Sequence, residues 1–223
     1  MCGRYVVNTT KETLSKKFKV KDVPDVKLSR FNIAPTQNIL AVRSTEGERE
    51  LALFHWGLIP SWAKDEKMAS KMINARSETV TEKPSYKEAF KRRRCLIPTS
   101  GFYEWQKTKE GKQPFYFQMK DEELFAFAGL WDRWKNERDE IIESCTILTT
   151  EANEILKPVH ERMPVILHES DYDLWFDDDV RKQGLRLELF RPFSADEMKS
   201  YAVSSLVNSP SNDDVRCTNQ DLL

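Results

Sequence analysis

The chain has 223 residues, of which 39% are hydrophobic and 11% aromatic, and this composition supports a folded core and argues against wholesale disorder. No run of about 18 apolar residues occurs and the N-terminus lacks a signal-peptide pattern, so we expect a soluble, cytoplasmic protein with no membrane segment. Net charge is −1, but residues 1–112 hold 23 Lys and Arg against 13 Asp and Glu, a balance of +10, and the remainder balances at −11. The asymmetry fits a basic face for an anionic partner, or two halves that mix their charges across one surface.

Before residue 94 the pattern predicts helices, a turn and two strands. Residues 10–19 favour a short helix, because Thr10 is a suitable N-cap and Leu14 and Phe18 lie one turn apart on one side. Pro35 predicts a rigid turn, because its ring keeps the preceding residue out of the helical region. Strands are expected at residues 38–43 and 51–56, and a second helix at 85–93.

Beyond residue 94, strand-like segments follow one another at short intervals. They lie at residues 94–98, 101–106, 114–119, 124–130 and 141–148, with a hairpin turn expected within 107–113. Short helices are expected at 150–157 and 170–176, late strands at 187–193 and 200–204, and a polar tail at about 208–223. Because no linker or repeat interrupts the series, we expect one compact α+β domain over residues 1–223, with an antiparallel, strand-rich core and peripheral short helices.

The start of the chain carries a reactive candidate. Cys2 follows the initiator Met1, and a small second residue permits removal of that methionine. The mature chain then begins with an amine and a thiol on adjacent carbons, a 1,2-aminothiol that traps an aldehyde twice, first as a Schiff base and then as a thiazolidine ring. The α-amine titrates near ~8 and a free thiol near ~8.5, so modest help leaves both nucleophilic at neutral pH. The plain alternative is an accident of start-codon context.

The other cysteines predict no special chemistry. Cys95 and Cys145 fall in apolar strand candidates and are interpreted as reduced core residues. The four cysteines and three histidines show neither a CxxC pair nor metal-ligand spacing, so we expect no metal and no cofactor.

Separate motifs along the chain fit a known family. They are Cys2-Gly3-Arg4, Asn32-Ile33-Ala34-Pro35, Trp56-Gly57-Leu58-Ile59-Pro60, Ile73-Asn74-Ala75-Arg76, Gly101-Phe102-Tyr103-Glu104-Trp105 and Pro158-Val159-His160-Glu161-Arg162-Met163-Pro164. In this order and spacing, from residue 2 to about residue 205, the chain closely resembles the SRAP family, named SOS response-associated peptidase and understood as abasic-site processing proteins.

The resemblance implies a compact α+β fold and a covalent DNA–protein cross-link. Members bind an abasic site in single-stranded DNA and capture its ring-opened sugar aldehyde through the N-terminal cysteine; a junction with double-stranded DNA is one setting. The family roles fall on Cys2 as nucleophile, Asn74 as its positioner, Glu104 as acid and base near the amine, and His160 at the sugar. The chemistry of these residue types agrees: a carboxylate accepts the amine proton, an imidazole titrating near ~6.5 donates to the ring oxygen, and an amide both donates and accepts.

The same motifs supply candidate DNA contacts. Arginines beside the chemical residues are suited to clamp phosphates, tryptophans to stack on bases, and a proline turn to act as a wedge beside the lesion. The DNA-binding candidates are Gly3, Arg4, Pro35, Trp62, Arg76, Trp105 and Arg162. The duller interpretations are core packing for either tryptophan and simple exposure for Glu104, whose strand alternation puts it on the same face as Phe102. Trp56, Trp131, Trp134 and Trp175 are interpreted as packing residues, and His55 and His168 as structural or exposed.

Two other functions remain open at this stage. An N-terminal cysteine peptidase or amidohydrolase would use Cys2 on a carbonyl with His160 as base. A non-covalent single-strand binding module would need the arginines and tryptophans but not Cys2, and salt would abolish its binding. For the leading hypothesis we expect a monomer in the cytoplasm that associates with the nucleoid when bound to DNA.

Overall fold

Residues 38–56 form a β-hairpin whose two strands are part of the wall of a closed barrel. In the computed structural model, which describes residues 2–179 and 182–220, β3 (Asn38–Thr45) pairs with β4 (Glu48–Trp56) from Asn38↔His55 to Thr45↔Glu48. Met1, which the proposed chemistry requires to be removed, and the last three residues of the expected tail lie outside the described residues.

The barrel closes because β10 (Ile141–Glu151), its last strand in chain order, pairs with β4 as well as with β9 (Phe125–Lys135). β3 also pairs with β6 (Arg94–Thr99), β6 pairs with β9, β9 pairs with β10, and β10 pairs with β4. The pairing of β10 with β4 is parallel, and so is its pairing with the short β5 (Asn74–Arg76). The core is therefore antiparallel except at β10, a parallel arrangement that the sequence pattern did not predict. Two short strands, β11 (Arg162–Pro164) and β12 (Ile166–Leu167), extend the same sheet.

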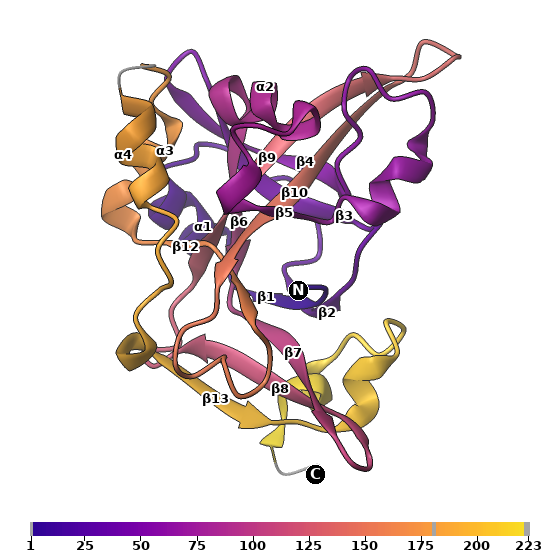
Figure 1. Ribbon diagram of the computed structural model, residues 1–223, viewed down its shortest axis with the longest axis vertical. Coiled ribbons are helices and arrows are strands. Elements are labelled where there is room, and N and C mark those ends of the chain that lie inside the picture. The colour runs from indigo at the N-terminus through magenta and orange to yellow at the C-terminus, as the bar shows by residue number, and fades with distance from the viewer. Residues whose placement is uncertain (1, 180–181, 221–223) are drawn as a thin grey trace.

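A second, fully antiparallel sheet lies against one end of the barrel (Figure 1). Its order is β13 (Met198–Ala202), β8 (Gly111–Met119), β7 (Gly101–Thr108), β1 (Tyr5–Asn8) and β2 (Ser29–Ile33). β6 runs into β7 with Ser100 alone between them, so one stretch of chain belongs to both sheets. This continuity brings the start of the chain, in β1, to the junction of the two sheets.

The helices are short and peripheral. α1 (Lys11–Phe18) begins at the expected N-cap, where Thr10 accepts the Thr13 N–H at 3.2 Å, and it buries Leu14 and Phe18 against the barrel. The others are α2 (Pro84–Arg92), α3 (Tyr172–Phe176) and α4 (Gln183–Glu188). The short 3₁₀ helices are η1 (Glu66–Lys71), η2 (Ser77–Thr79), η3 (Glu169–Asp171), η5 (Ala195–Glu197), η6 (Ser205–Asn208) and η7 (Val215–Thr218). The predicted α+β class, with a strand-rich core and peripheral short helices, is confirmed.

Two expected elements were wrong. Residues 150–157 do not form a helix, because β10 continues to Glu151 in register with β11 and the chain then turns about Asn153, whose Oδ1 accepts the Leu156 N–H. Residues 187–193 do not form a strand: their apolar alternation belongs to the end of α4 and the turn after it, where Phe190 packs against Phe90 and Trp175.

The expected polar tail is a packed segment over its described part. Cys217 in η7 is fully buried, in a cluster with Tyr103 and Tyr116 of the second sheet. Among the described residues, no helix is long and apolar enough to span a membrane.

Candidate active site

Cys2 lies in a buried position at the junction of the two sheets. Its side chain has 0% exposed surface and belongs to an apolar cluster with Tyr5, Trp56, Ile147 and Met163. The chain enters this position because Tyr5 pairs with both Ile33 and Phe102, which fixes the start of β1 between β2 and β7. Burial raises the pKa of the Cys2 thiol above its usual value, and the charge of Glu104 raises it further. The thiol is therefore held in its neutral form.

Asn74 binds the main chain of Cys2. Its Nδ2 donates to the Cys2 carbonyl oxygen at 2.9 Å, while its Oδ1 is buried and has no hydrogen-bond partner among the described residues. β5 holds Asn74 by parallel pairing with Ile147, and the buried Trp56 supports the preceding residue because its Nε1 donates to the Ile73 carbonyl at 3.0 Å. An unsatisfied buried acceptor is costly, so this oxygen is suited to a donor from a ligand or from the chain terminus.

Glu104 is a buried carboxylate on β7. Only 3% of its surface is exposed, and its charge acts on the Cys2 thiol, so the two side chains face the same interior. Alternation correctly groups Glu104 with Phe102, but Tyr103 between them is buried as well, because the C-terminal segment covers the opposite face of β7. The interpretation of Glu104 as an exposed strand residue is thus wrong, and burial of a carboxylate is typical of a functional position.

His160 lies in the turn between β10 and β11. The preceding residues Leu156 and Val159 pack in the same apolar cluster as Cys2, and Gln106 of β7 donates through Nε2 to the Pro158 carbonyl at 3.0 Å. The ring orientation is set by Nδ1, which accepts the Arg162 N–H at 2.9 Å. A main-chain amide can only donate, so neutral His160 carries its proton on Nε2.

The three candidate arginines have different surroundings. Arg4 donates to Asn32 Oδ1 and to the carbonyls of the C-terminal segment, and Arg162 forms a two-pronged ion pair with Glu78 and a hydrogen bond to the Thr149 carbonyl at 2.6 Å. Hydrogen bonds from Arg162 keep the pKa of Glu78 below its usual value. Arg76 is exposed at the end of β5 and makes no side-chain hydrogen bond within the described residues. Of these three arginines, Arg76 therefore has the guanidinium that is most available to a phosphate.

Two further candidate DNA contacts, Pro35 and Gly3, lie near the start of the chain. Pro35 lies in a turn closed by the Gln37 N–H and the Ala34 carbonyl at 3.4 Å, and this turn follows Ile33, the pairing partner of Tyr5. It is therefore beside half-buried Gly3 at the start of the chain.

Trp105 and Trp62 differ in their surroundings. Trp105 is half-buried next to Glu104 and donates through Nε1 to Asn208 Oδ1 at 2.7 Å. Trp62 is 58% exposed in the loop before η1, and its neighbours Ser61 and Ala63 contact Asp132 and Trp134, toward the far end of β9. Trp105 is therefore held beside Glu104 of β7, whereas the loop that carries Trp62 is held against β9.

Several contacts that organise the site were not predicted from the sequence. Gln106 anchors the His160 turn, and Asn32 and Asp213 connect β2 to the C-terminal segment. Gln37 accepts a hydrogen bond from Arg30 of β2. Asn32 and Glu104 are both polar residues in an apolar strand, but the carbonyl partners of Asn32 in the C-terminal segment lie more than 170 positions away. In residues 2–179 and 182–220, no group of three or more His, Cys, Asp or Glu side chains is arranged to hold a metal ion.

Fold and motifs together define the class of protein. The family model described as SOS response associated peptidase (SRAP) matches residues 1–210, and the chain belongs to this family.

Named relatives and solved structures agree with that membership. The chain is 41% identical over 215 residues to abasic site processing protein YoaM of Bacillus subtilis (strain 168), covering 95% of each protein. It is 35% identical over 193 residues to abasic site processing protein HMCES of Xenopus tropicalis, covering 76% of this chain and 57% of that one. A crystal structure of a protein from Bacteroides thetaiotaomicron is similar with a TM-score of 0.87 at 25% identity, over 98% of this chain and 99% of that chain.

Proposed function

We propose that this chain processes abasic sites in single-stranded DNA by forming a covalent cross-link through Cys2. The observation that carries the proposal is the shared interior of the Cys2 thiol, the Glu104 carboxylate and the Asn74 amide, which binds the Cys2 carbonyl. Three groups of this kind around a chain terminus are suited to aminothiol chemistry on an aldehyde. The names of the relatives, abasic site processing proteins, supply the aldehyde: an abasic deoxyribose opens to a free aldehyde at C1′.

The reaction balances without an external reagent. After removal of Met1, the Cys2 amine adds to the C1′ aldehyde and one water leaves, giving an imine. The Cys2 sulfur then bonds to C1′, the imine π electrons move to nitrogen, and the thiol proton ends on that nitrogen. The product is a five-membered thiazolidine, equal to protein plus DNA less one water.

Ring closure also protects the DNA strand. An iminium at C1′ acidifies the C2′ protons and invites β-elimination of the 3′ phosphate, which breaks the strand. Closing the thiazolidine removes the iminium, so a protein that stops at the Schiff base would cleave DNA and one that closes the ring would shield it.

Each neighbouring residue has a role in this scheme that fits its surroundings. Glu104 takes the proton from the attacking amine and returns one to reopen the ring, which makes the cross-link reversible. His160, with its proton on Nε2, donates to the sugar ring oxygen during opening. Asn74 holds the Cys2 carbonyl and offers its buried Oδ1 to the amine or to a sugar hydroxyl. Exposed Arg76 contacts a flanking phosphate.

The test is a denaturing gel of the protein with a single-stranded oligonucleotide that carries one abasic site. We expect a shifted covalent band that Cys2→Ala abolishes, whereas Cys217→Ala, a matched cysteine variant outside the cluster of Cys2, retains it. Cys2→Ala and Cys2→Ser both keep the α-amine but lack the thiol, so in place of the stable band each is expected to give a Schiff base that borohydride traps, with strand cleavage. Equal cross-linking by Cys2→Ala and the unmodified chain would falsify the proposal. Turnover of a peptide or amide without DNA would favour the thiol peptidase, and binding without a covalent band the non-covalent module.

A further inference from the structure

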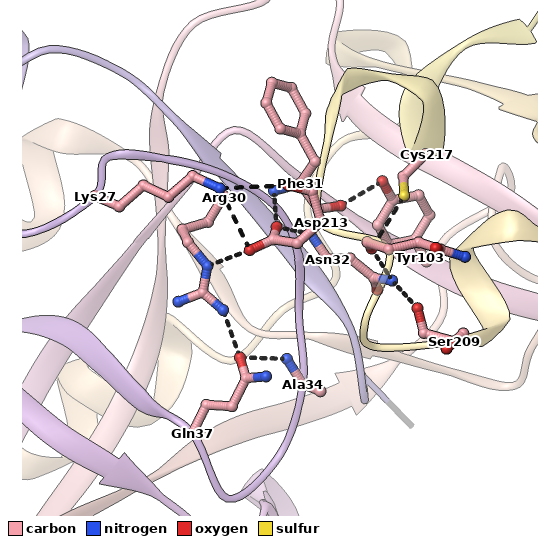
Figure 2. A network of polar contacts seen from close by, with 11 residues as sticks. Lys27, Arg30, Phe31, Asn32, Ala34, Gln37, Tyr103, Ser209, Asp213 and Cys217 are labelled. Carbon is pink, nitrogen blue, oxygen red and sulfur yellow. Dashed lines mark hydrogen bonds and ion pairs between the residues drawn. The ribbon is translucent and has the colours of Figure 1, made fainter.

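The segment after β13 is tied to β2 by a network of hydrogen bonds centred on Asn32 (Figure 2). Asn32 has 0% exposed surface, and its Nδ2 lies 3.1, 2.9 and 2.8 Å from the carbonyl oxygens of Val207, Ser209 and Asn212. An amide nitrogen has only two hydrogens, so three acceptors saturate it and fix the amide orientation. The opposite end of the amide, Oδ1, is thereby aimed at Arg4, which donates to it from Nη1 at 2.9 Å.

Arg4 is bound along both its side chain and its main chain. The guanidinium also donates to the Val207 carbonyl at 2.7 Å and to the Asn208 carbonyl at 3.3 Å. The Arg4 carbonyl accepts the Tyr103 N–H at 3.0 Å, and the Tyr103 hydroxyl donates to the Phe31 carbonyl at 2.8 Å. Arg4 is thus held between β2, β7 and the C-terminal segment.

Asp213 fixes the strand that presents Asn32. Its Oδ1 accepts the Phe31 and Asn32 amides at 2.6 and 3.0 Å, and its Oδ2 accepts from Arg30 Nε at 2.5 Å, as Figure 2 shows. Burial acts to raise the pKa of Asp213, but the hydrogen bonds from Arg30 and from these amides outweigh it and keep that pKa below its usual value. The carboxylate is therefore charged while it holds β2.

The network extends to the turn that carries Pro35. Arg30 Nη2 donates to Gln37 Oε1 at 2.6 Å, and the same oxygen accepts the Ala34 N–H at 3.2 Å. Figure 2 shows this relay running from Asp213 through Arg30 to Gln37. The Asp213 carboxylate therefore fixes β2 directly and the Pro35 turn through Arg30 and Gln37.

Arg4 lies only two residues after Cys2. Because even an extended chain advances only ~3.3–3.6 Å per residue, the Arg4 anchor is at most ~7 Å along the chain from the nucleophile, with Gly3 between them. On its other side, Cys2 is bound by the Asn74 amide at 2.9 Å. A chain terminus is mobile unless it is tied down, and these two attachments are suited to do so.

We propose that Arg4, Asn32 and Asp213 are positioning residues that hold the N-terminal Cys2 in its reactive place, so that the C-terminal segment acts on the nucleophile through Arg4. This inference rests on the proposed function, since it concerns how the cross-linking residue is oriented. It assigns to Arg4 a role inside the protein, in place of the phosphate contact that its motif suggests.

The two roles of Arg4 predict different kinetics. A positioning residue sets the rate constant of cross-linking at saturating DNA, because a displacement of the nucleophile by a fraction of an ångström slows a reaction that depends on alignment. A phosphate contact sets the DNA concentration that gives half the maximal rate, and its contribution falls as salt rises. Single-turnover cross-linking measured over a range of concentrations of the abasic oligonucleotide separates these two quantities.

The first variant is Asp213→Asn, with Asp214→Asn as its matched control. The asparagine keeps the side-chain volume and one acceptor but presents either a donor or a neutral oxygen to Arg30. Asp214 is half-exposed, binds Arg216 and makes no hydrogen bond to β2 among the described residues. We expect Asp213→Asn to lower the saturating rate constant about tenfold, with less than about threefold change in the half-saturating DNA concentration. Asp214→Asn is expected to match the unmodified chain.

Arg4→Met is the second variant, and it decides the question if Asp213→Asn shows no cooperative thermal transition. It removes the guanidinium but keeps an apolar stem, and we expect the same loss in saturating rate constant. The variant that carries both Asp213→Asn and Arg4→Met should have the same saturating rate constant as Arg4→Met alone, because both changes act through one contact. If the two changes damaged the structure independently, their effects on the rate constant would multiply.

Retention of the saturating rate by either folded variant, or a salt-sensitive rise in the half-saturating DNA concentration of Arg4→Met, overturns the inference. These outcomes leave the proposed function intact as long as the unmodified chain cross-links and Cys2→Ala does not. Loss of cross-linking in the unmodified chain would instead refute the proposed function.

Discussion

Burial of Cys2 has consequences for the proposed chemistry of its thiol. The raised pKa keeps sulfur protonated, and a protonated thiol is a poor target for oxidants and alkylating agents. In the proposed ring closure this is no handicap, because the thiol adds to an activated imine and its proton passes to nitrogen. The Glu104 charge, which disfavours a thiolate, favours a nearby ammonium and iminium instead. Glu104 thus suits the nitrogen half of the reaction better than the sulfur half.

Asn74→Asp tests the contact between β5 and the N-terminus. The substitution keeps the side-chain volume but replaces the donor to the Cys2 carbonyl by a second acceptor, so the attachment at 2.9 Å is lost. An unsatisfied buried group costs about 1–3 kcal/mol, so we expect the cross-linking rate at saturating DNA to fall roughly tenfold or more. The measurement is single-turnover cross-linking, with thermal unfolding followed in parallel. A rate equal to that of the unmodified chain would show that Asn74 does not position Cys2.

At the level of single residues, the sequence indicates the candidate reactive residues better than it indicates the residues that hold them in place. Cys2 and Glu104 could be singled out because a thiol at a chain terminus and a carboxylate in an apolar strand are unusual in themselves. Asn32 and Gln106 are ordinary until their partners are known, and these partners lie in segments that only the fold brings near. The engagement of Arg4 and Arg162 inside the protein was hidden for the same reason.

At the level of elements, the position of Asn74 depends on how η1 packs on the end of β4. Gly57 has a φ of +137°, and a Cβ at that position would lie 2.4 Å from the Ala69 carbonyl oxygen. The Gly57 amide donates to the Cys145 carbonyl at 2.9 Å, and the next amide, Leu58, donates to the Met72 carbonyl at 3.1 Å. This turn therefore joins the barrel to the segment that leads into β5.

Gly57→Ala is expected to destabilise the protein and to disturb the site. Both the backbone conformation and the contact with Ala69 disfavour a side chain, so the free energy of unfolding should fall by at least about 2 kcal/mol. Gly184→Ala is the control, because a Cβ there meets nothing within 4 Å. Urea unfolding of the two variants checks this, and equal midpoints would contradict the described turn.

The local sequence pattern predicted most helices and strands correctly. It failed where pairing between strands distant in the sequence determines the secondary structure. Helix α1 and the hairpin of β3 and β4 follow from a cap residue and from alternation, which act within a few positions. Residues 150–157 carry a helical pattern, yet pairing of β10 with β11 keeps the first of them extended. The parallel pairing of β10 with β4 and β5 joins segments about 70 to 90 residues apart, a distance that periodicity does not report.

For the molecule as a whole, the two charge-asymmetric halves of the sequence fold together. β10 of the acidic half lies between β4 and β9 and also pairs with β5, so the halves interleave within one barrel. Ion pairs accordingly join them, including Arg43 with Glu143 and Lys17 with Glu123. These two ion pairs fit a mixing of charges across one surface, and the basic face for an anionic partner stays a prediction.

The buried acidic groups predict sensitivity to alkaline pH. Burial raises the pKa values of Cys2, Cys95, Cys145 and several tyrosines above their usual values. Unfolding lets these groups ionise at ordinary values, 9.0 for cysteine, so above that pH the unfolded chain binds fewer protons than the folded one. The contribution of these groups to the free energy of unfolding is therefore fully present below about pH 9. It is lost as the pH rises toward the pKa values that they have in the folded protein. Thermal melting between pH 7 and 11 checks this, and a midpoint that does not fall above pH 9 would contradict it.

The central claim is a thiazolidine between Cys2 and the abasic sugar, and intact mass spectrometry tests it most directly. The purified protein alone should have the mass of the chain without Met1, and after incubation with an abasic single-stranded oligonucleotide it should gain the mass of that oligonucleotide less one water. Proteolysis should then place the adduct on the N-terminal peptide that begins with Cys2. Retention of Met1 in the cross-linked species, or an adduct on any other residue, would contradict the account.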